Sequence, residues 1–370
     1  MKKLMVITAL LIFIAGSANA ADWNFYGSAR VATFYTKMEV SPFDGGADTD
    51  NYEQNLNGNG RIGARVKVSD TLTGQFEYGA LGGKADVRIL WGEWNFGGAS
   101  LGIGQHYTPL FFPYSNQVYN ISALNKGDHN MSTYGMLYGD RKAQIRLNVG
   151  GFRVALVELN SLVSFFPGGA AQPKTEVKTP QIQAKYQYNF ENGHVAFAGG
   201  YGTFDVLSGS KAHKVNSYLA GIGGSLNIGS AYLKGNLWGG QNVGNLACIL
   251  VSGSLWSTAE NAGTSDFDGD GWGLARWDGT KVTDRNGLGA LIVAGYKIRE
   301  GLYLETGYGY VSTELDMAGS KKDDAATYYI QSTIFLAPGV SFTPEIGRID
   351  SKQDGQFGVT YFGIKWQINF

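Results

Sequence analysis

The sequence has little of several residue types on which other classes of protein depend. It contains one cysteine, Cys248, so no internal disulfide can form, and we expect this side chain to be a packed or lipid-facing apolar group. The four histidines are scattered, without the spacing to serine, cysteine or carboxylate residues that a catalytic or metal centre needs. We therefore expect no enzyme. The formal net charge of −1 gives no case for nucleic-acid binding.

Long apolar runs are also scarce, and the clearest one lies at the start of the chain. A basic Met1-Lys2-Lys3 precedes an apolar run over residues 4–15, and Ala18-Asn19-Ala20 fits a small-x-small cleavage pattern. This order predicts a cleaved signal peptide over residues 1–20 and a mature domain over residues 21–370. The alternative is a transmembrane anchor, which is disfavoured because about 20 apolar residues are needed to span a bilayer.

Glycine and aromatic residues, by contrast, are abundant. The 54 glycines are about twice the average usage, and there are 21 tyrosines, 20 phenylalanines and 8 tryptophans. This composition fits many strands and tight turns, and argues against long helices. Apolar and polar residues alternate with a period of two, most clearly over residues 181–190 and again over residues 61–68 and 328–336. Segments of about ten residues with this pattern are typical of transmembrane β-strands.

The connections between these segments alternate between short and long. Seven short ones carry turn residues, at 70–71, 97–98, 150–151, 191–193, 229, 299–301 and 338–339. Eight are mostly longer, near 39–58, 82–84, 108–138, 161–178, 206–213, 242–283, 315–325 and 351–356. Fifteen connections predict an all-β, antiparallel transmembrane barrel of sixteen strands, which leaves an aqueous channel. A soluble β-sandwich also alternates, but these strands are long for a sandwich.

The end of the sequence carries the sharpest local pattern. Large apolar residues occupy every even position from Phe362 to Phe370, and the odd positions between them are mostly polar. In lipid every backbone N–H and C=O must be paired within the protein, so we expect this strand to close the barrel against the first strand. The alternative is an ordinary amphipathic strand.

Several short motifs, taken in their order along the chain, resemble those of the general bacterial porin family. Residues 23–30 resemble the first porin strand, 61–65 the second, 88–92 the fourth, 100–109 the fifth, and 141–146 with 150–152 the sixth strand and its turn; Phe370 matches the terminal aromatic. The resemblance implies a sixteen-stranded barrel with an inward-folded third loop, usually a homotrimer, in a bacterial outer membrane with its lipid and lipopolysaccharide.

The resemblance also implies a pore constriction, in which wall arginines face the third loop, here residues 108–138. The predicted constriction residues are Arg30, Arg61, Arg88, Arg141, Tyr107, Lys126 and Asp128, with Arg30 added by strand parity. A charge that faces lipid near the midplane costs about 2–4 kcal/mol, so strand-centre arginines should face the lumen. The alternative is that they are solvated lumen residues or structural ion-pair partners. Strict alternation places Arg141 opposite to Lys142, so its inclusion requires a bulge or a different register.

The sequence departs from the family pattern in two loops. The third loop has few charges, Lys126, Asp128 and His129, and it carries aromatic residues where the family has an acidic stretch. With several arginines facing one aspartate, we expect a neutral or weakly anion-selective constriction. The second loop, near residues 82–84, is too short to latch onto a neighbouring subunit, so trimerisation would rest on the outer faces of the early strands.

One acidic motif lies in the expected loop 242–283. Asp266, Asp268 and Asp270 have the spacing of the opening half of a calcium loop, followed by Gly271. The twelfth position is Trp277, not glutamate, which excludes a complete helix–loop–helix site. A structural calcium ion completed by Asp278 or by carbonyl groups, and a merely solvated acidic loop, both remain open. No other cofactor is expected.

The sequence therefore predicts a water-filled channel for passive diffusion of ions and small hydrophilic solutes. The main alternative is a substrate-selective channel, because the aromatic third loop offers stacking surfaces to sugars or small organic acids. An outer-membrane enzyme would need a nucleophile set that the sequence does not offer. An adhesin or receptor would act through the long loops.

Overall fold

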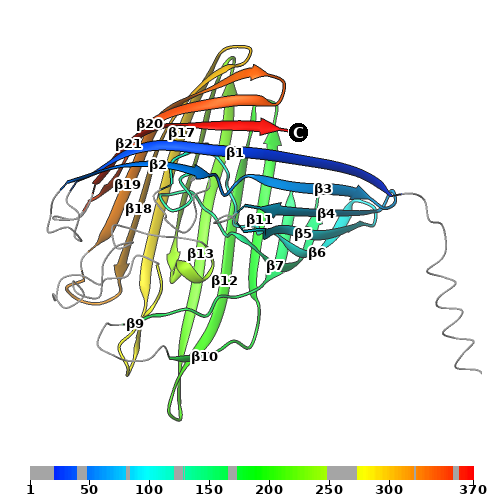
Figure 1. The fold of residues 1–370 in the computed structure, drawn as a ribbon. Coiled ribbons are helices and arrows are strands. Elements are labelled where there is room, and N and C mark those ends of the chain that lie inside the picture. Colours follow the sequence, from blue (N-terminus) through cyan, green and yellow to red (C-terminus); the bar gives the residue numbers. More distant parts are fainter. Residues whose placement is uncertain are drawn as a thin grey trace, which may run out of the picture.

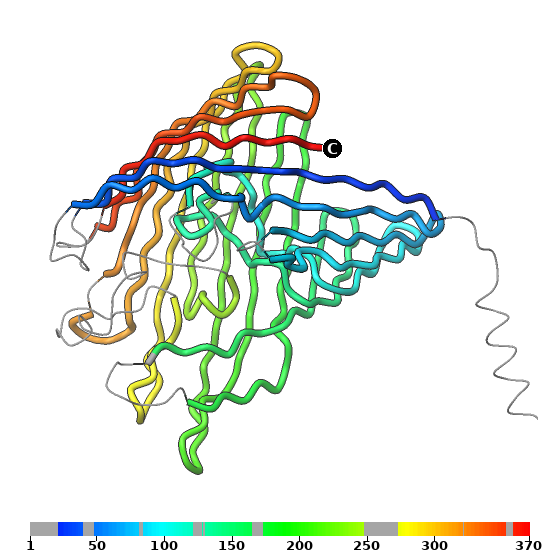
Figure 2. The backbone as a smooth tube through the Cα atoms, viewed as in Figure 1, coloured from blue at the N-terminus to red at the C-terminus, as the bar shows by residue number. Residues whose placement is uncertain are grey.

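A computed structural model of the chain describes residues 21–39, 48–80, 84–120, 128, 130–165, 173–247, 273–320, 322–352 and 358–370. Its strands form one antiparallel barrel (Figures 1 and 2). They are β1 (Asp22–Glu39), β2 (Thr49–Leu56), β3 (Arg61–Lys67), β4 (Leu72–Gly79), β5 (Asp86–Asn95), β6 (Ala99–Tyr107), β7 (Arg141–Val149), β8 (Phe152–Val157), β10 (Lys174–Glu176), β11 (Gln181–Phe190), β12 (Gly193–Ser208), β13 (Lys211–Ile228), β14 (Ala231–Gln241), β17 (Arg285–Arg299), β18 (Leu302–Leu315), β19 (Asp323–Ala337), β20 (Val340–Ser351) and β21 (Gly358–Asn369).

The barrel closes between its first and last strands. Residues Ser28 to Glu39 of β1 pair with Asn369 to Gly358 of β21, and Gly27 and Phe370 exchange two backbone hydrogen bonds of 2.6 and 3.0 Å. The final strand therefore closes the barrel as its alternation predicts. Closure matters because an open edge would leave backbone groups unpaired in lipid.

The described residues give sixteen strands, as predicted. Two of these strands are made of two segments each: β2 and β3 both pair with β1, while β10 and β11 both pair with β12. β2 lies within the expected loop 39–58, so that expectation was wrong over residues 49–56. The expected loop 206–213 was also wrong, because β12 and β13 stay paired to Ser208 and Lys211 and meet in a two-residue turn.

The strands of the hairpin β12–β13 persist there because apolar side chains cover them. Phe204, Val206 and Val215 are buried with Val163 and Trp277, which come from two other long loops. Those loops form a small sheet of β9 (Ser164–Phe165), β15 (Arg276–Trp277) and β16 (Val282–Thr283). Of the described residues, only η2 (Val243–Asn245) is helical, and no described helix is long and apolar enough to cross a membrane.

The outer surface of the barrel is apolar. Strand β17 alternates along its length, with Leu288, Ile292 and Tyr296 exposed and every odd-numbered residue between them buried. The same pattern exposes Phe25 and Trp366 on the strands that close the barrel. An apolar band of this kind is stable only against hydrocarbon, so the outward face is the lipid-facing one.

A charge placed on the lipid-facing surface should destabilise the barrel. Ile292, at the centre of β17, is a suitable position to test this. We expect Ile292→Lys to lower the free energy of unfolding in lipid by about 2–4 kcal/mol, because the ammonium would lie in hydrocarbon. Denaturant titration of the barrel in vesicles measures this cost. The control Ile292→Ala removes the same side chain without adding charge and should cost much less; equal costs for the two variants would contradict the lipid-facing assignment.

Candidate pore constriction

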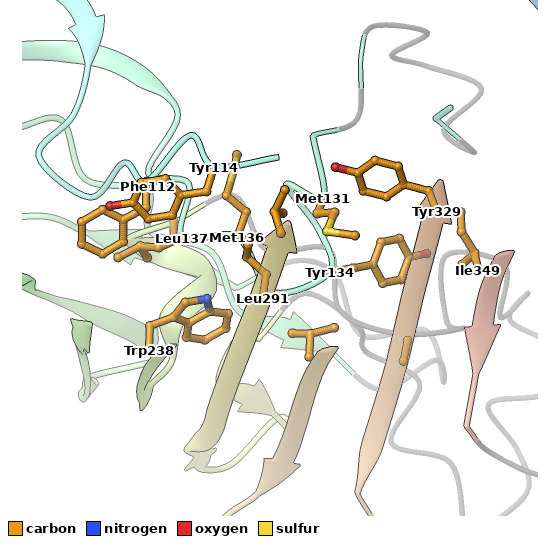
Figure 3. Packing of buried hydrophobic residues seen from close by; sticks show 14 of the residues in the cluster. Phe112, Tyr114, Met131, Tyr134, Met136, Leu137, Trp238, Leu291, Tyr329 and Ile349 are labelled. Atoms are coloured by element: carbon orange, nitrogen blue, oxygen red, sulfur yellow. The ribbon is translucent and has the colours of Figure 1, made fainter. Parts of the chain in front are cut away.

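The third loop lies inside the barrel. It leaves β6 after Tyr107 and returns to β7 at Arg141, so it ends two residues beyond the expected boundary of 138. Leu110, Phe112 and Leu137 are fully buried in an apolar cluster that the loop shares with the barrel wall (Figure 3). The wall supplies mostly small or branched inward-facing side chains: Ala196, Ala198, Leu219, Val293, Val311 and Ala325. This part of the wall is therefore apolar on both faces, unlike the polar lumen expected of a simple channel.

Two carboxylates of the wall hold the backbone of the loop. Glu345 of β20 accepts hydrogen bonds from the N–H groups of Val118 and Tyr119, at 2.7 and 2.8 Å. Glu305 of β18 accepts two more from Asn116, one from its backbone N–H and one from its side-chain amide. Both carboxylates are almost fully buried. Because a buried N–H without a partner costs about 1–3 kcal/mol, these bonds fix the path of the loop.

The returning half of the loop is held by close backbone packing. Gly135 adopts φ +101°, and a Cβ at this position would lie 2.1 Å from the carbonyl oxygen of Ala290 on the wall. Its own carbonyl accepts hydrogen bonds from Trp238 and Asn236 of β14. Only glycine combines this backbone angle with so close an approach.

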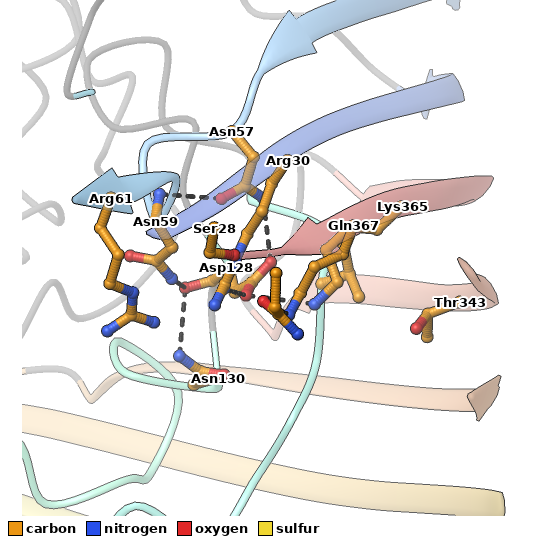
Figure 4. A network of polar contacts seen from close by, with 12 residues as sticks. Ser28, Arg30, Asn57, Asn59, Arg61, Asp128, Asn130, Thr343, Lys365 and Gln367 are labelled. Carbon is orange, nitrogen blue, oxygen red and sulfur yellow. Dashed lines mark hydrogen bonds and ion pairs between the residues drawn. The ribbon is translucent and has the colours of Figure 1, made fainter. Parts of the chain in front are cut away.

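Asp128 ties the loop to the first and last strands (Figure 4). Its carboxylate accepts hydrogen bonds from Arg30 of β1 at 2.8 Å, from Lys365 of β21 at 3.1 Å and from Asn57 at 2.9 Å. Burial alone would raise the pKa of Asp128, but the charges of Lys365 and Arg30 and the hydrogen bonds from Lys365 and Asn57 outweigh it, so this pKa lies below its ordinary value. Asp128 therefore stays ionised at neutral and mildly acidic pH.

Arg61 and Arg88 share a buried partner on the strand between them. Glu77 of β4 lies 2.7 Å from the Arg88 Nε and 3.3 Å from the Arg61 Nη1. Simple alternation would place Arg88 on the same face as Leu90, which is exposed to lipid. A register shift between β4 and β5, where Glu77 pairs with Ile89 and Tyr78 with Val87, turns Arg88 inward.

An irregular backbone also turns Arg141 toward the lumen. The residue before it, Asp140, has a positive φ of 60°, and β7 begins only at Arg141. Strict alternation therefore starts after this twist, with Lys142 already buried on the lumen side. The Arg141 guanidinium lies 5.6 Å from the centre of the Tyr107 ring, whose hydroxyl accepts a hydrogen bond from Arg88.

These side chains line one cavity of about 400 Å³, which we call the arginine cavity. Its charged lining residues are Arg30, Arg61, Arg88, Arg141, Lys365, Asp86 and Asp128, and Tyr107 lines it as well. The structure thus brings together six of the seven residues named from the sequence. The seventh, Lys126, lies outside the described residues, as do His129, Cys248 and the three aspartates of the calcium motif, Asp266, Asp268 and Asp270.

Sequence reasoning missed Glu77, Glu305, Glu345 and Lys365. Each lies within a strand, and a charged residue within a membrane strand is expected to face the lumen. That rule could have placed all four inside the barrel. It could not have shown which of them hold the loop, because the contact partners lie between 189 and 237 residues away in the sequence for Glu305, Glu345 and Lys365.

The Glu345 anchor can be tested directly. In Glu345→Ala the N–H groups of Val118 and Tyr119 lose their acceptor, so we expect their hydrogen exchange to speed up by about ten-fold or more. Hydrogen exchange followed by mass spectrometry on peptides covering residues 115–120 measures this. Glu345→Gln retains one acceptor oxygen, so its exchange rate should lie between those of Glu345→Ala and the wild type. Unchanged exchange in Glu345→Ala would show that apolar packing alone holds the loop.

Comparison with solved structures finds the same fold in bacterial outer-membrane channels. The outer-membrane channel DcaP of Acinetobacter baumannii aligns with a TM-score of 0.67 at 15% identity, covering 96% of this chain and 99% of that chain. The anion-selective porin of Comamonas acidovorans aligns with a TM-score of 0.57 at 12% identity, over 94% and 100%. OmpT of Vibrio cholerae, in its trimer form, aligns with a TM-score of 0.56 at 16% identity, over 95% and 100%.

A scan against protein-family models finds no match, and a search of curated proteins finds none. The likeness is therefore one of fold, at low sequence identity. It agrees with the resemblance carried by the short strand motifs. Together with the apolar outer surface, the fold indicates a barrel that spans a membrane, as these outer-membrane channels do. The chain has the closed, sixteen-stranded fold of the bacterial outer-membrane porins.

Proposed function

We propose that the barrel is a channel through which ions and small hydrophilic solutes diffuse passively, with a preference for anions. The observation that carries this proposal is the charge of the arginine cavity. Five lysine and arginine side chains line it against two aspartates, a formal excess of three positive charges. Fixed charges in a narrow passage with low-dielectric walls concentrate ions of the opposite sign and exclude ions of the same sign.

One carboxylate behind the cavity surface, Glu77, pairs with Arg61 and Arg88 and reduces this excess to two positive charges, whereas Glu305 and Glu345 do not line the cavity. Glu305 and Glu345 are buried beneath the third loop and accept its hydrogen bonds. Glu77 lies behind Arg61 and Arg88 and is itself almost fully buried. Arg141 faces the cavity with one weak ionic contact, 3.7 Å from Asp140.

We propose a general channel in preference to a substrate-selective one. Selectivity for sugars or small organic acids would need several aromatic faces along the passage. The arginine cavity is lined by the rings of Tyr107, Phe111 and Tyr138. The other third-loop aromatics are buried against the wall: Phe112, Tyr114, Tyr119 and Tyr134. They serve loop packing, and Tyr107 and Phe111 stack on each other at 4.3 Å, so few ring faces remain for a solute.

Removing charge from the arginine cavity should weaken its anion preference. We expect Arg141→Gln to shift the reversal potential in a KCl gradient toward the potassium value, and Glu77→Gln/Arg61→Gln/Arg88→Gln, which also removes one net positive charge, to shift it by a similar amount. The triple variant includes Glu77 because a buried carboxylate left without its two cationic partners would destabilise the barrel. Planar-bilayer recordings measure both shifts.

Arg65→Gln provides the matched control for these recordings. Arg65 lies on the same strand as Arg61 and faces the same way, but it does not line the arginine cavity. Its reversal potential should stay close to that of the wild type. A cation-selective wild type, or a shift in Arg65→Gln as large as that in Arg141→Gln, would contradict the proposed filter.

We also propose that the chain assembles as a homotrimer. Strands β4 to β8 have only six to ten residues, whereas β12 and β13 have 16 and 18. A tilted strand of eight residues rises about 20 Å, short of the roughly 25 Å apolar band of such barrels. The outer face of this low wall is apolar, with Leu90, Ile103 and Ile145 exposed, and a neighbouring subunit would cover it. OmpT provides a trimeric example of the fold.

A trimer of independent pores should give a specific electrical signature. We expect single insertions into a planar bilayer to close in three equal steps at high voltage, because each subunit carries its own channel. Chemical cross-linking in detergent provides a second measurement of the subunit number. Closure in one step, together with a monomeric cross-linking pattern, would overturn the trimer.

A further inference from the structure

A second cavity, of about 640 Å³, lies on the other side of the third loop. We call it the turn-side cavity, because Gly150 of the short β7–β8 turn lines it and His194 and Ser225 lie close to two further short turns. Its charged and titratable lining residues are Arg146, Arg153, Lys185, Lys234, His106, His194 and Glu93. Four lysine and arginine side chains thus face one carboxylate, a formal excess of three positive charges.

Two of these cations, Arg146 and Lys185, are buried and donate their hydrogen bonds to neutral carbonyl groups of the third loop and its approach. The Arg146 guanidinium lies 4.5 Å from the centre of the Trp91 ring and 3.9 Å from Glu93, which is too far for a strong ion pair. Its Nε has no hydrogen-bond partner among the described residues, although the residue is only 7% exposed. Lys185 donates a hydrogen bond of 2.8 Å to the carbonyl of Phe111, a neutral acceptor.

The arrangement of the cations also destabilises the folded barrel. Lys185 of β11 and Arg153 of β8 are direct partners across adjacent strands, and like charges in this position destabilise a sheet. Lys234 of β14 faces Ser225, which in turn faces His194, so the positive groups continue along the next strands. Fold stability alone gives no reason to gather these charges, whereas binding of an anion does.

We propose that the turn-side cavity binds a multiply charged oxyanion of the phosphate type. Guanidinium and ammonium groups make their strongest hydrogen bonds to such oxygens, and Asn148, Gln187 and Ser225 add neutral donors to the lining. The proposal rests on the proposed channel function, because a solute reaches this cavity through the lumen. It adds a second anion site in series with the arginine cavity. The stacked rings of Tyr107 and Phe111, 4.3 Å apart, line both cavities and mark their boundary.

The test uses inorganic pyrophosphate as a blocker of the chloride current in planar bilayers. We expect pyrophosphate to block the wild-type channel in a saturable manner, and more strongly from the side of the short turns. Arg153→Gln/Lys234→Gln should raise the half-blocking concentration by about ten-fold or more, since two charge-assisted interactions are removed. Each single variant should show a smaller rise. Chloride current without pyrophosphate shows that every variant has folded.

Arg65→Gln/Lys67→Gln is the matched control. It removes the same charge from β3, which also ends at a short turn but does not line the turn-side cavity. Its half-blocking concentration should stay within about two-fold of the wild type, because a distant charge is screened over about 10 Å. Equal weakening of block in both double variants would overturn the proposal in favour of a general positive field.

Failure of this site and failure of the channel proposal give different results. A wild type that conducts chloride but shows no saturable block by pyrophosphate would overturn the oxyanion site and leave the channel in place. A wild type that conducts no ions would overturn both. Block that persists unchanged in Arg153→Gln/Lys234→Gln would also overturn the turn-side site.

Discussion

The passage through this barrel depends on the attachment of one loop to an apolar part of the inner wall. Sixteen strands enclose a space too wide for side chains of the wall alone to fill. The third loop fills part of it, and its backbone groups must find partners once water is displaced. Glu305 and Glu345 supply those partners from the wall. These two carboxylates are therefore used to hold the loop, while Arg61, Arg88 and Arg141 line the arginine cavity.

The fold follows from the sequence because its signals are repeated. Alternation with a period of two recurs in most of the strands, and the turn residues at positions such as 97–98 and 338–339 mark the strand ends. The errors lie where a strand leaves the membrane. Composition suggests a loop over residues 206–213, but Phe204, Val206 and Val215 pack beneath two distant loops and keep the strands paired. Only the tertiary contacts decide that outcome.

The residues of the candidate site could be predicted from the sequence only in part. Arg30 and Arg61 face inward by simple parity, so a pattern argument can find them. Arg88 and Arg141 face inward because of a register shift and a positive φ, so parity does not find them and they were named from the family resemblance. Glu305 and Glu345 were missed because their role depends on which segment packs above them. A local pattern gives the side of the sheet but not the partner across the lumen.

The pairing of Glu77 with two arginines bears on how such a filter can evolve. A single substitution at Arg61 or Arg88 leaves the buried carboxylate with one cationic partner, and loss of both leaves it with only the hydroxyl of Tyr26. Variants that reverse the local charge therefore pass through less stable intermediates unless Glu77 changes as well. Arg141, which has no such partner, can vary alone. Descendants of this chain should thus diversify at Arg141 first and retain Glu77, Arg61 and Arg88 as a co-inherited set.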